Sequence, residues 1–350
     1  MKINRLPAPT WNRLKVNATE VNAVRPNKAA GYEEKLPEGV DKIHGRGIGP
    51  LSDVTIKTGL GEEFDKFIED AGFKPEGYVV SDEEKIETPL YQTFDVKGND
   101  ASVALFDYSL SDNAELTVIQ IVKDEDNESG VFFVQNKYRL SKGAKLTIVQ
   151  IQTLSESKEF YNDIGGYVSD DASFNLIQIV LGAKNNYYGA NACLAGKNSA
   201  LNLAVAYSLK NDELLDMNYV ADHNGKNSES DIKANGVMQG RANKLFRGTI
   251  DFHKGCAGSK GAELEDVLLI DDTIVNKTVP LILCDEEDVE GAHGATIGRP
   301  DESFLFYMGS RGIPREEAYE LLKRAKIDAV ANLIEDEKTK TYIAECLDRA

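Results

Sequence analysis

A motif that recurs along the chain about every 27 to 30 residues constrains its fold more than any other feature. Four copies begin at Asn113, Gly143, Asp171 and Asn198, and each continues as a short run with apolar residues at alternate positions. One such run cannot bury its own apolar face, whereas stacking successive copies does. Val, Ile, Thr, Phe and Tyr dominate the runs, and these residues favour strands. The repeat therefore predicts a mainly β fold, a β-solenoid, rather than a helical repeat.

Polar residues recur at equivalent positions of these copies. Three copies share a glutamine, and all four share a threonine or an asparagine at an earlier position. In a parallel stack, like side chains lie above one another at about 4.8 Å and form ladders. An antiparallel sandwich is the alternative, and it would leave these side chains unstacked. The residues are Gln120, Gln150 and Gln178, and Thr117, Thr147, Asn175 and Asn202.

Helical patterns flank the repeats. We divide the chain into a partly helical N-terminal region (1–88), a solenoid core (89–298) and a C-terminal helical region (299–350). In the first region, four apolar residues share one helical stripe, and acids occupy its first turn. This helix is expected to pack against the end of the solenoid. The stripe consists of Phe64, Phe67, Ile68 and Ala71.

The C-terminal region predicts two helices. Pro314 suits the first turn of the first helix, where Glu316 and Glu317 complement the positive helix end. Two apolar stripes follow, which could cap the last coil, as solenoids need, or form a docking surface. The stripes consist of Ala318, Leu321, Leu322, Ala325, Ala329, Leu333 and Ile334, and of Tyr342, Ile343, Cys346 and Leu347.

The charge of the chain limits its partners. A formal net charge of −18 argues against nonspecific binding to nucleic acid or to an anionic membrane surface, because phosphate recognition relies on clustered Lys and Arg. Protein partners or cations are expected instead. No apolar stretch approaches the roughly 20 residues that cross a bilayer, and no signal-peptide pattern is present, so we expect a cytosolic location.

The four cysteines are Cys193, Cys256, Cys284 and Cys346. They are far apart and form no C-x-x-C pair, so neither a zinc ribbon nor a ferredoxin-type cradle is indicated. Cys193 is expected in the core and Cys346 in a helical stripe. His253 and Cys256 form a conceivable metal pair whose spacing is not diagnostic. Any other metal site must combine distant residues or two chains.

A more specific pattern follows the last repeat. HGAT begins at His293, LFY at Leu305 and SRGI at Ser310. This ordered series resembles the C-terminal signature of the SufB/SufD family of iron–sulfur cluster assembly scaffolds, and D-type members are the closer match. The segment LPAPTW, which ends at Trp11, also resembles the opening motif of D-type members. The resemblance implies a right-handed parallel β-helix core.

The resemblance also implies a function. The chain would be a non-catalytic scaffold subunit that pairs edge to edge with a SufB-like chain. Its C-terminal helices would bind the SufC ATPase, so that ATP is hydrolysed by the partner. The cargo would be iron or a transient iron–sulfur cluster, and whether flavin takes part stays open. The implied SufC-binding residues are Arg311, Gly312, Ile313, Glu316, Tyr319 and Leu322.

Two residues are the candidate iron or nascent-cluster ligands. Imidazole suits iron, and glycines at 291 and 294 would let the backbone near His293 approach a cluster or a partner closely. The resemblance places His293 at the cluster-building interface, and the alternative is a structural histidine. Cys284, at the end of an apolar run, could supply a thiolate or be a half-buried structural thiol. The acids from Asp285 to Asp288 are expected to form a solvated loop.

The chain departs from the family pattern at three points. B-type scaffolds carry a glutamate after the signature histidine, where this chain has Gly294. The cysteine that accepts sulfur in B-type scaffolds has no convincing counterpart around Val275 to Thr278. Many D-type proteins have a cysteine at the position of Gly291. Sulfur acceptance by this chain is therefore doubtful, and most cluster ligands should come from a partner.

Two alternatives to the heteromeric scaffold stay open. A self-sufficient homodimeric scaffold could combine Cys284 and His293 from two chains. A β-helical carbohydrate-active enzyme would need recurring acids with Arg or Lys in a solenoid groove. The repeats carry Gln, Thr and Asn instead, which disfavours the enzyme.

Overall fold

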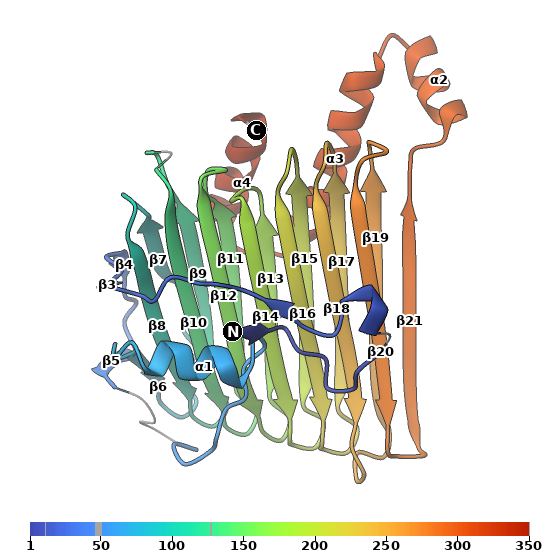
Figure 1. Cartoon of the computed structure of the whole chain (residues 1–350). Helices are drawn as coiled ribbons and strands as arrows, with labels where there is room; N and C mark the ends of the chain where they lie inside the picture. The colour runs from blue at the N-terminus through green and yellow to red at the C-terminus, as the bar shows by residue number, and fades with distance from the viewer. Residues whose placement is uncertain (11, 46–50, 127, 350) are drawn as a thin grey trace.

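The computed structural model describes residues 1–10, 12–45, 51–126 and 128–349, so that Trp11 of the opening motif lies outside the described residues. Two β-sheets form its centre, and the chain alternates between them as it winds from one end to the other (Figure 1). From β6 onward in sheet I and from β7 onward in sheet II, strands that neighbour each other are therefore two apart in chain order. This arrangement is the β-solenoid predicted from the repeat.

We refer to the two sheets as sheet I and sheet II. Sheet I contains β5 (Val40–His44), β6 (Glu76–Val80), β8 (Ala101–Leu110), β10 (Gly130–Leu140), β12 (Lys158–Val168), β14 (Asn185–Leu194), β16 (Leu214–His223), β18 (Asn243–Phe252) and β20 (Val275–Cys284), with β3 (Lys28–Ala29) beside β8. Sheet II contains β4 (Glu33–Lys35), β7 (Leu90–Asp95), β9 (Glu115–Lys123), β11 (Lys145–Thr153), β13 (Ser173–Val180), β15 (Ala200–Leu209), β17 (Glu229–Met238), β19 (Ser259–Leu269) and β21 (Val289–Gly298).

The residues that open each repeat turn the chain between coils. Asn113, Gly143, Asp171 and Asn198 have φ values of 56°, 67°, 57° and 57°, in the left-handed region that Gly, Asn and Asp tolerate best. The Asn113 amide donates to the carbonyl of Lys142 in the next turn, at 2.8 Å. The turns of successive coils thus stack on one another, as the strands do.

The glutamines of the repeat form the expected ladder. Gln120 Nε2 donates to Gln92 Oε1 at 2.8 Å, Gln150 Nε2 to Gln120 Oε1 at 2.8 Å, and Gln178 Nε2 to Gln150 Oε1 at 2.7 Å. All four side chains are buried between the sheets. Tyr219 completes the ladder, because its hydroxyl donates to Gln178 Oε1 at 2.6 Å.

A second ladder runs along the outside of sheet II. Thr117, Thr147, Asn175 and Asn202 are consecutive register partners in parallel pairs, and Asn202 Nδ2 donates to Asn175 Oδ1 at 3.0 Å. The pairing from β7 to β21 is parallel throughout the described strands of sheet II, which rules out the antiparallel sandwich.

The two ends of the solenoid differ. At the first coil, β5 pairs antiparallel with β6, and β4 pairs antiparallel with β7, so both sheets receive an added strand. At the last coil, β20 and β21 each pair with one strand only among the residues that the structure describes. One end is therefore covered and the other is open.

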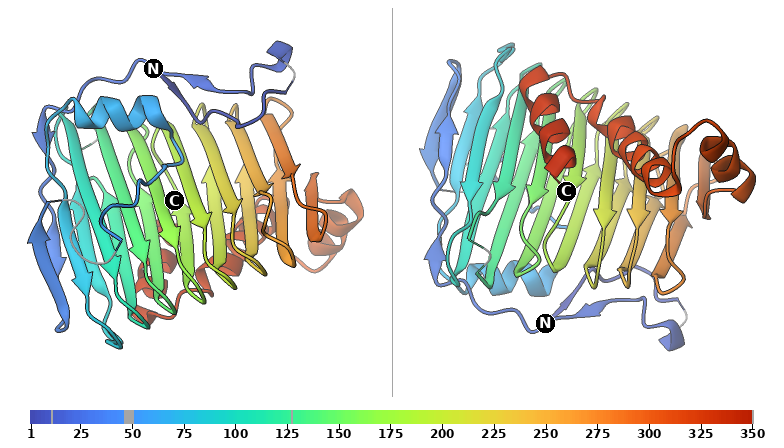
Figure 2. Two further views of the ribbon diagram at one scale, coloured as in Figure 1. Left: turned by 90° about the horizontal axis from the view of Figure 1, so that it is seen from below. Right: turned by 90° about the horizontal axis from the view of Figure 1, so that it is seen from above.

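The N-terminal region lies along the side of the solenoid. Helix α1 (Glu62–Glu69) buries Phe64 and Ile68 against the outer face of sheet I, where they contact residues such as Phe133 and Tyr161. The expectation that this helix packs against the end of the solenoid is wrong, because the outer face of sheet I offers it a row of apolar side chains. The strap before it contains β1 (Lys2–Ile3), η1 (Asn12–Leu14) and β2 (Thr19–Glu20) and lies on the same side (Figure 2).

The C-terminal helices pack on the opposite side. Helices α3 (Arg315–Ala331) and α4 (Glu337–Arg349) cover the outer face of sheet II, and α2 (Glu302–Ser310) projects beyond it (Figures 1 and 2). They do not cap the last coil. No helix in the described ranges combines the length and apolar character needed to span a membrane.

The predicted stripe that begins at Ala318 is only partly correct, because Ala318 and Ile334 are buried but its other members are wholly or partly exposed. Leu321 and Leu333 are 46% and 53% exposed, whereas Ile327 and Val330 pack on Ile177 and its neighbours in sheet II. The helix places its aliphatic β-branched side chains, rather than its leucines, on the sheet. Two apolar faces share this helix, and sequence periodicity alone does not say which one meets the solenoid.

We expect the inner ladder to stabilise the fold more than the outer one. Gln150→Leu keeps the volume but leaves Gln120, Asn162 and Gln178 without their buried partner. It should lower the free energy of unfolding by about 2 to 4 kcal/mol. Asn175→Leu, its matched control on the outer ladder, should cost less than about 1 kcal/mol. Equal losses in urea denaturation would contradict this account.

Candidate functional site

The open last coil presents unpaired strand edges and apolar side chains. The strands β20 and β21 are ten residues each. Val275 of β20 and Ile297 of β21 are 43% and 40% exposed there, and Leu264 of the neighbouring strand β19 is 48% exposed. An uncovered edge with apolar neighbours is a template for pairing with another chain. This end of the molecule is therefore the principal candidate for a functional surface.

Cys284 is the last residue of β20. Its register partner in β18 is Phe252, a core residue, so Cys284 belongs to the row that faces the interior. No further coil covers it, and the thiol is exposed. Its Sγ lies 3.0 Å from the carbonyl oxygen of Glu286. The acids at 285, 287 and 288 of the following turn are exposed, as expected.

His293 lies in β21 and is exposed. Its register partner in β19 is Glu263, which is buried, so His293 also belongs to the inward-facing row of the open coil. A histidine in this row of an inner coil would be surrounded by core side chains. At the last coil it is accessible to a partner or to an ion.

The structure brings Cys284 and His293 to the same open end but not to one site. His293 is four residues beyond Val289, where β21 begins, which corresponds to roughly 13 Å along the strand. Neither residue therefore belongs to a set of three ligand side chains within the part of the chain that the structure describes.

Charged residues lie in the interior just beneath the last coil, and the sequence analysis missed them. Lys244 Nζ forms an ion pair with Glu265, and both side chains are almost fully buried. Thr278 of the last coil joins them, because its hydroxyl donates to Glu265 Oε2 at 2.6 Å. A Cβ at Gly248 would lie 2.2 Å from Glu263 Oε2, so only glycine leaves room for this carboxyl. Polar and charged side chains therefore occupy the interior directly beneath the open last coil.

A signal for these residues was present in the sequence. In β19, Gly261, Glu263, Glu265 and Val267 alternate with exposed residues, so two acids share the inward row with an apolar side chain. Acids on a buried row are unusual unless they are paired or functional. The pattern could have been read from the segment GAELEDV.

The pair of His253 and Cys256 does not form. Cys256 is buried in a small apolar cluster with Ile250 and Phe252, whereas His253 lies on the outer side and faces Asp222. Cys193 is half-buried rather than in the core, and it stacks between Tyr167 and Asp222 on the outer row of sheet I. Cys346 belongs to α4 and is half-buried.

The predicted SufC-binding residues lie around the junction of α2 and α3. Arg311 follows α2 and its guanidinium lies 5.3 Å from the ring centroid of Tyr307. Gly312 has φ of 87°, which the tight turn requires. Ile313, Tyr319 and Leu322 are half-buried, and Glu316 is exposed.

This junction carries an apolar surface of its own. Phe306 is 80% exposed, the largest exposure among the large hydrophobic residues described, and Tyr307 is 53% exposed. Arg315 holds the two helices together through two hydrogen bonds to Glu302, of 3.0 and 2.7 Å. A fixed hairpin with exposed aromatic side chains is typical of a protein-binding surface.

The pKa of Glu263 is raised to about 7, first by burial and then by the neighbouring Glu265, while Lys244 acts to lower it. The folded protein therefore holds a proton that the unfolded chain, with an ordinary value of 4.5, releases as the pH rises from 4.5 to 7. Stability falls through this window by up to about 3 kcal/mol from this group. Glu263→Gln should reduce the loss of melting temperature between pH 5 and pH 8.

Glu290→Gln provides the control, because that side chain is 75% exposed beside Lys260. It should leave the pH dependence of the melting temperature unchanged. A Glu263→Gln curve parallel to the wild-type curve would show that Glu263 does not titrate in this way.

Comparison with known proteins agrees with this architecture. Residues 96–326 match the family model described as SUF system FeS cluster assembly, SufBD core domain. The iron–sulfur cluster assembly protein SufD of Bacillus subtilis is 33% identical over 127 residues, which cover 36% of this chain and 29% of that protein. The SufD protein of Escherichia coli is 26% identical over 184 residues, which cover 52% and 43%.

A SufBD family protein of Mycobacterium tuberculosis is 32% identical over 109 residues, which cover 31% of this chain and 13% of that protein. The matched segment spans less than half the length of each of these relatives. The family model covers well over half of this chain, including the solenoid from β8 to β21. The chain therefore belongs to the SufB/SufD family of iron–sulfur cluster assembly proteins and is similar to its SufD members.

Proposed function

We propose that this chain is a non-catalytic scaffold subunit of a SUF assembly, which pairs through its open last coil with a SufB-like chain. The observation that carries the proposal is the asymmetry of the solenoid, whose first coil is covered by β4 and β5 and whose last coil is open. Exposed edges are a liability that proteins normally block. An edge left open beside Cys284 and His293 is best explained by a partner.

Pairing at this end would use both sheets. The free edges of β20 and β21 could each accept a strand from the partner, and Val275 and Ile297 would be covered in the process. Their inward rows would then face a matching row of the partner. Cys284 and His293 would come to lie between two chains, which is where ligands from both can meet.

The cargo of this interface would be iron and sulfide. His293 offers an imidazole nitrogen and Cys284 an accessible sulfur, and both suit iron. This chain lacks the other ligands that family members carry near the signature histidine, since Gly291 and Gly294 occupy those positions. The SufB-like partner would therefore supply most ligands and accept the sulfur.

The α2–α3 hairpin would bind the SufC ATPase. Phe306 and Tyr307 supply exposed aromatic area, and the residues from Arg311 to Ile313 fix the angle between the helices. The hairpin follows β21 directly, so force applied to it would reach the last coil within a few residues. ATP binding and hydrolysis by SufC would then open or strain the interface that holds the cargo.

A first experiment tests the cargo site. This chain would be co-expressed with SufB-like and SufC proteins and purified without oxygen. In His293→Ala, we expect iron and acid-labile sulfide per assembly to fall by more than about half, because a direct ligand is lost. His44→Ala, an exposed histidine in β5 far from the last coil, is the matched control and should retain its cluster.

The mass of the assembly distinguishes the two scaffold models. A complex that contains this chain and a SufB-like chain supports the heteromeric scaffold. A stable dimer of this chain alone that holds iron and sulfide would support the homodimeric alternative. An assembly whose cluster is unaffected by both His293→Ala and Cys284→Ser would overturn the proposed site.

A second experiment tests the SufC surface. Phe306→Asp should weaken binding of SufC at least about tenfold, because aromatic anchors at the centre of an interface carry much of its energy. Leu14→Asp is the control, since Leu14 is 56% exposed but lies in the N-terminal strap. Equal SufC affinity of Phe306→Asp and the unmodified chain, measured by calorimetry, would place the contact elsewhere.

A further inference from the structure

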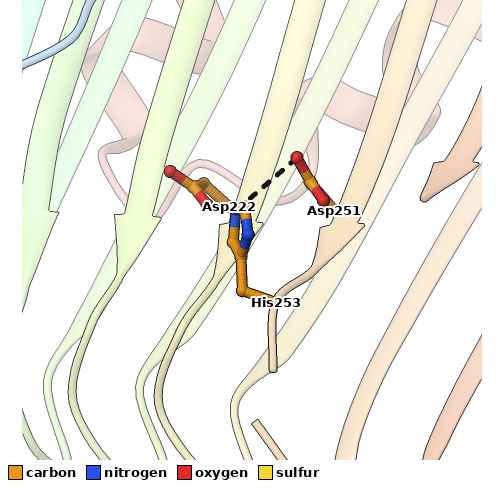
Figure 3. A group of neighbouring side chains, drawn as sticks. All are labelled: Asp222, Asp251 and His253. Carbon is orange, nitrogen blue, oxygen red and sulfur yellow. Dashed lines mark ion pairs between the residues drawn. The ribbon is translucent and has the colours of Figure 1, made fainter. Parts of the chain in front are cut away.

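Two carboxylates and an imidazole converge on the outer face of sheet I (Figure 3). Asp222 and Asp251 are register partners in β16 and β18, and His253 follows the end of β18. His253 Nε2 lies 2.5 Å from Asp222 Oδ1 and 3.5 Å from Asp251 Oδ2. One ligand atom from each of the three residues lies within 4.8 Å of the other two. No other group of three such side chains occurs among the described residues.

The arrangement concentrates negative charge. Like charges directly opposite each other on neighbouring strands are destabilising. Asp222 is itself only 9% exposed and accepts a hydrogen bond from Asn224 at 3.0 Å. A further cation at this point would therefore relieve repulsion.

The geometry suits a metal ion of moderate size. Ligand atoms bound at 2.0 to 2.2 Å can be at most about 4.4 Å apart. The three ligand atoms here all lie within 4.8 Å of one another, so small side-chain movements bring them into that range. The Asp222 and Asp251 side chains come from the regular part of two hydrogen-bonded strands, which fixes their backbone positions. His253 is 40% exposed, so water can complete the coordination.

We propose that Asp222, Asp251 and His253 bind one divalent first-row transition-metal ion, of the class of Fe²⁺, Mn²⁺ or Co²⁺. One imidazole with two carboxylates is a ligand set of mixed hardness that suits these ions better than a thiolate-rich site would. When the metal binds, His253 Nε2 leaves its contact with Asp222 Oδ1 and coordinates the metal instead. Solvent fills the remaining positions.

This site differs from the one at the open coil. It lies on the outer row of sheet I, whereas Cys284 and His293 belong to inward rows. The two are nevertheless close, because β18 is the neighbour of β20, which ends at Cys284. A metal here would be held within about one strand spacing of the last coil. The inference rests on this geometry and needs no SUF partner.

Titration of the full chain with Co²⁺, without oxygen and with excess Mg²⁺ to saturate the acidic surface, tests the proposal. We expect one equivalent of bound Co²⁺ with a visible ligand-field spectrum. His253→Gln and Asp251→Asn should each weaken binding at least about tenfold, because each removes one of three protein ligands. Added Fe²⁺ should displace the one bound equivalent of Co²⁺.

Two variants separate this site from the proposed cluster site. The double variant of Cys284→Ser and His293→Ala should keep the Co²⁺ equivalent, and His44→Gln should do the same. Binding that survives both His253→Gln and Asp251→Asn, or that is lost in the Cys284 and His293 double variant, would overturn the proposal. Absence of any bound Co²⁺ would show that His253 serves only as an ion-pair partner of the two carboxylates.

Discussion

In-register parallel pairing is the constraint on which the rest of this structure depends. Each strand lies on its counterpart one coil earlier with no residue inserted or lost along the paired stretch, as in the match of Gln120 with Gln150 and Gln178. A slip of one residue would turn every core side chain outward. The buried glutamine ladder resists such a slip, because its amides find partners in one register only. Left-handed residues at the turns keep the coil lengths compatible with that register.

The same constraint leaves the last coil open, at the end where we propose that a partner pairs. A stack of identical pairings has no intrinsic place to stop, so each end must be closed by something different. Here the first coil is closed by strands of reversed direction, and the C-terminal helices turn away to cover a side. The last coil thus retains interior-type residues, among them Thr278, Cys284 and His293, at an accessible edge. Replacing the next coil by a partner is the simplest way to complete it.

Much of this could be read from the sequence, and the exceptions have physical causes. The repeat predicted the solenoid, the turn residues and both ladders, because each is a local pattern repeated at a fixed spacing. The side of the solenoid that α1 covers could not be predicted, since the apolar outer row of sheet I appears only after folding. His253 was noticed, but it was paired with Cys256, because Asp222 is distant in sequence and comes beside it only when β16 and β18 pair. The acids beneath His293 were missed although their alternation was visible.

The N-terminal strap has a consequence for how the chain folds. Most contacts of a solenoid join neighbouring coils, so the stack can grow one coil at a time. Arg247, fully buried, instead donates to the carbonyl of Val16 at 2.6 Å across 231 residues of sequence, and to Asp216 at 2.6 Å. These hydrogen bonds can form only when β18 is in place, after the coils that precede it have formed. The N-terminal strap is thus among the last segments to be fixed, although it precedes in sequence the coils that it locks.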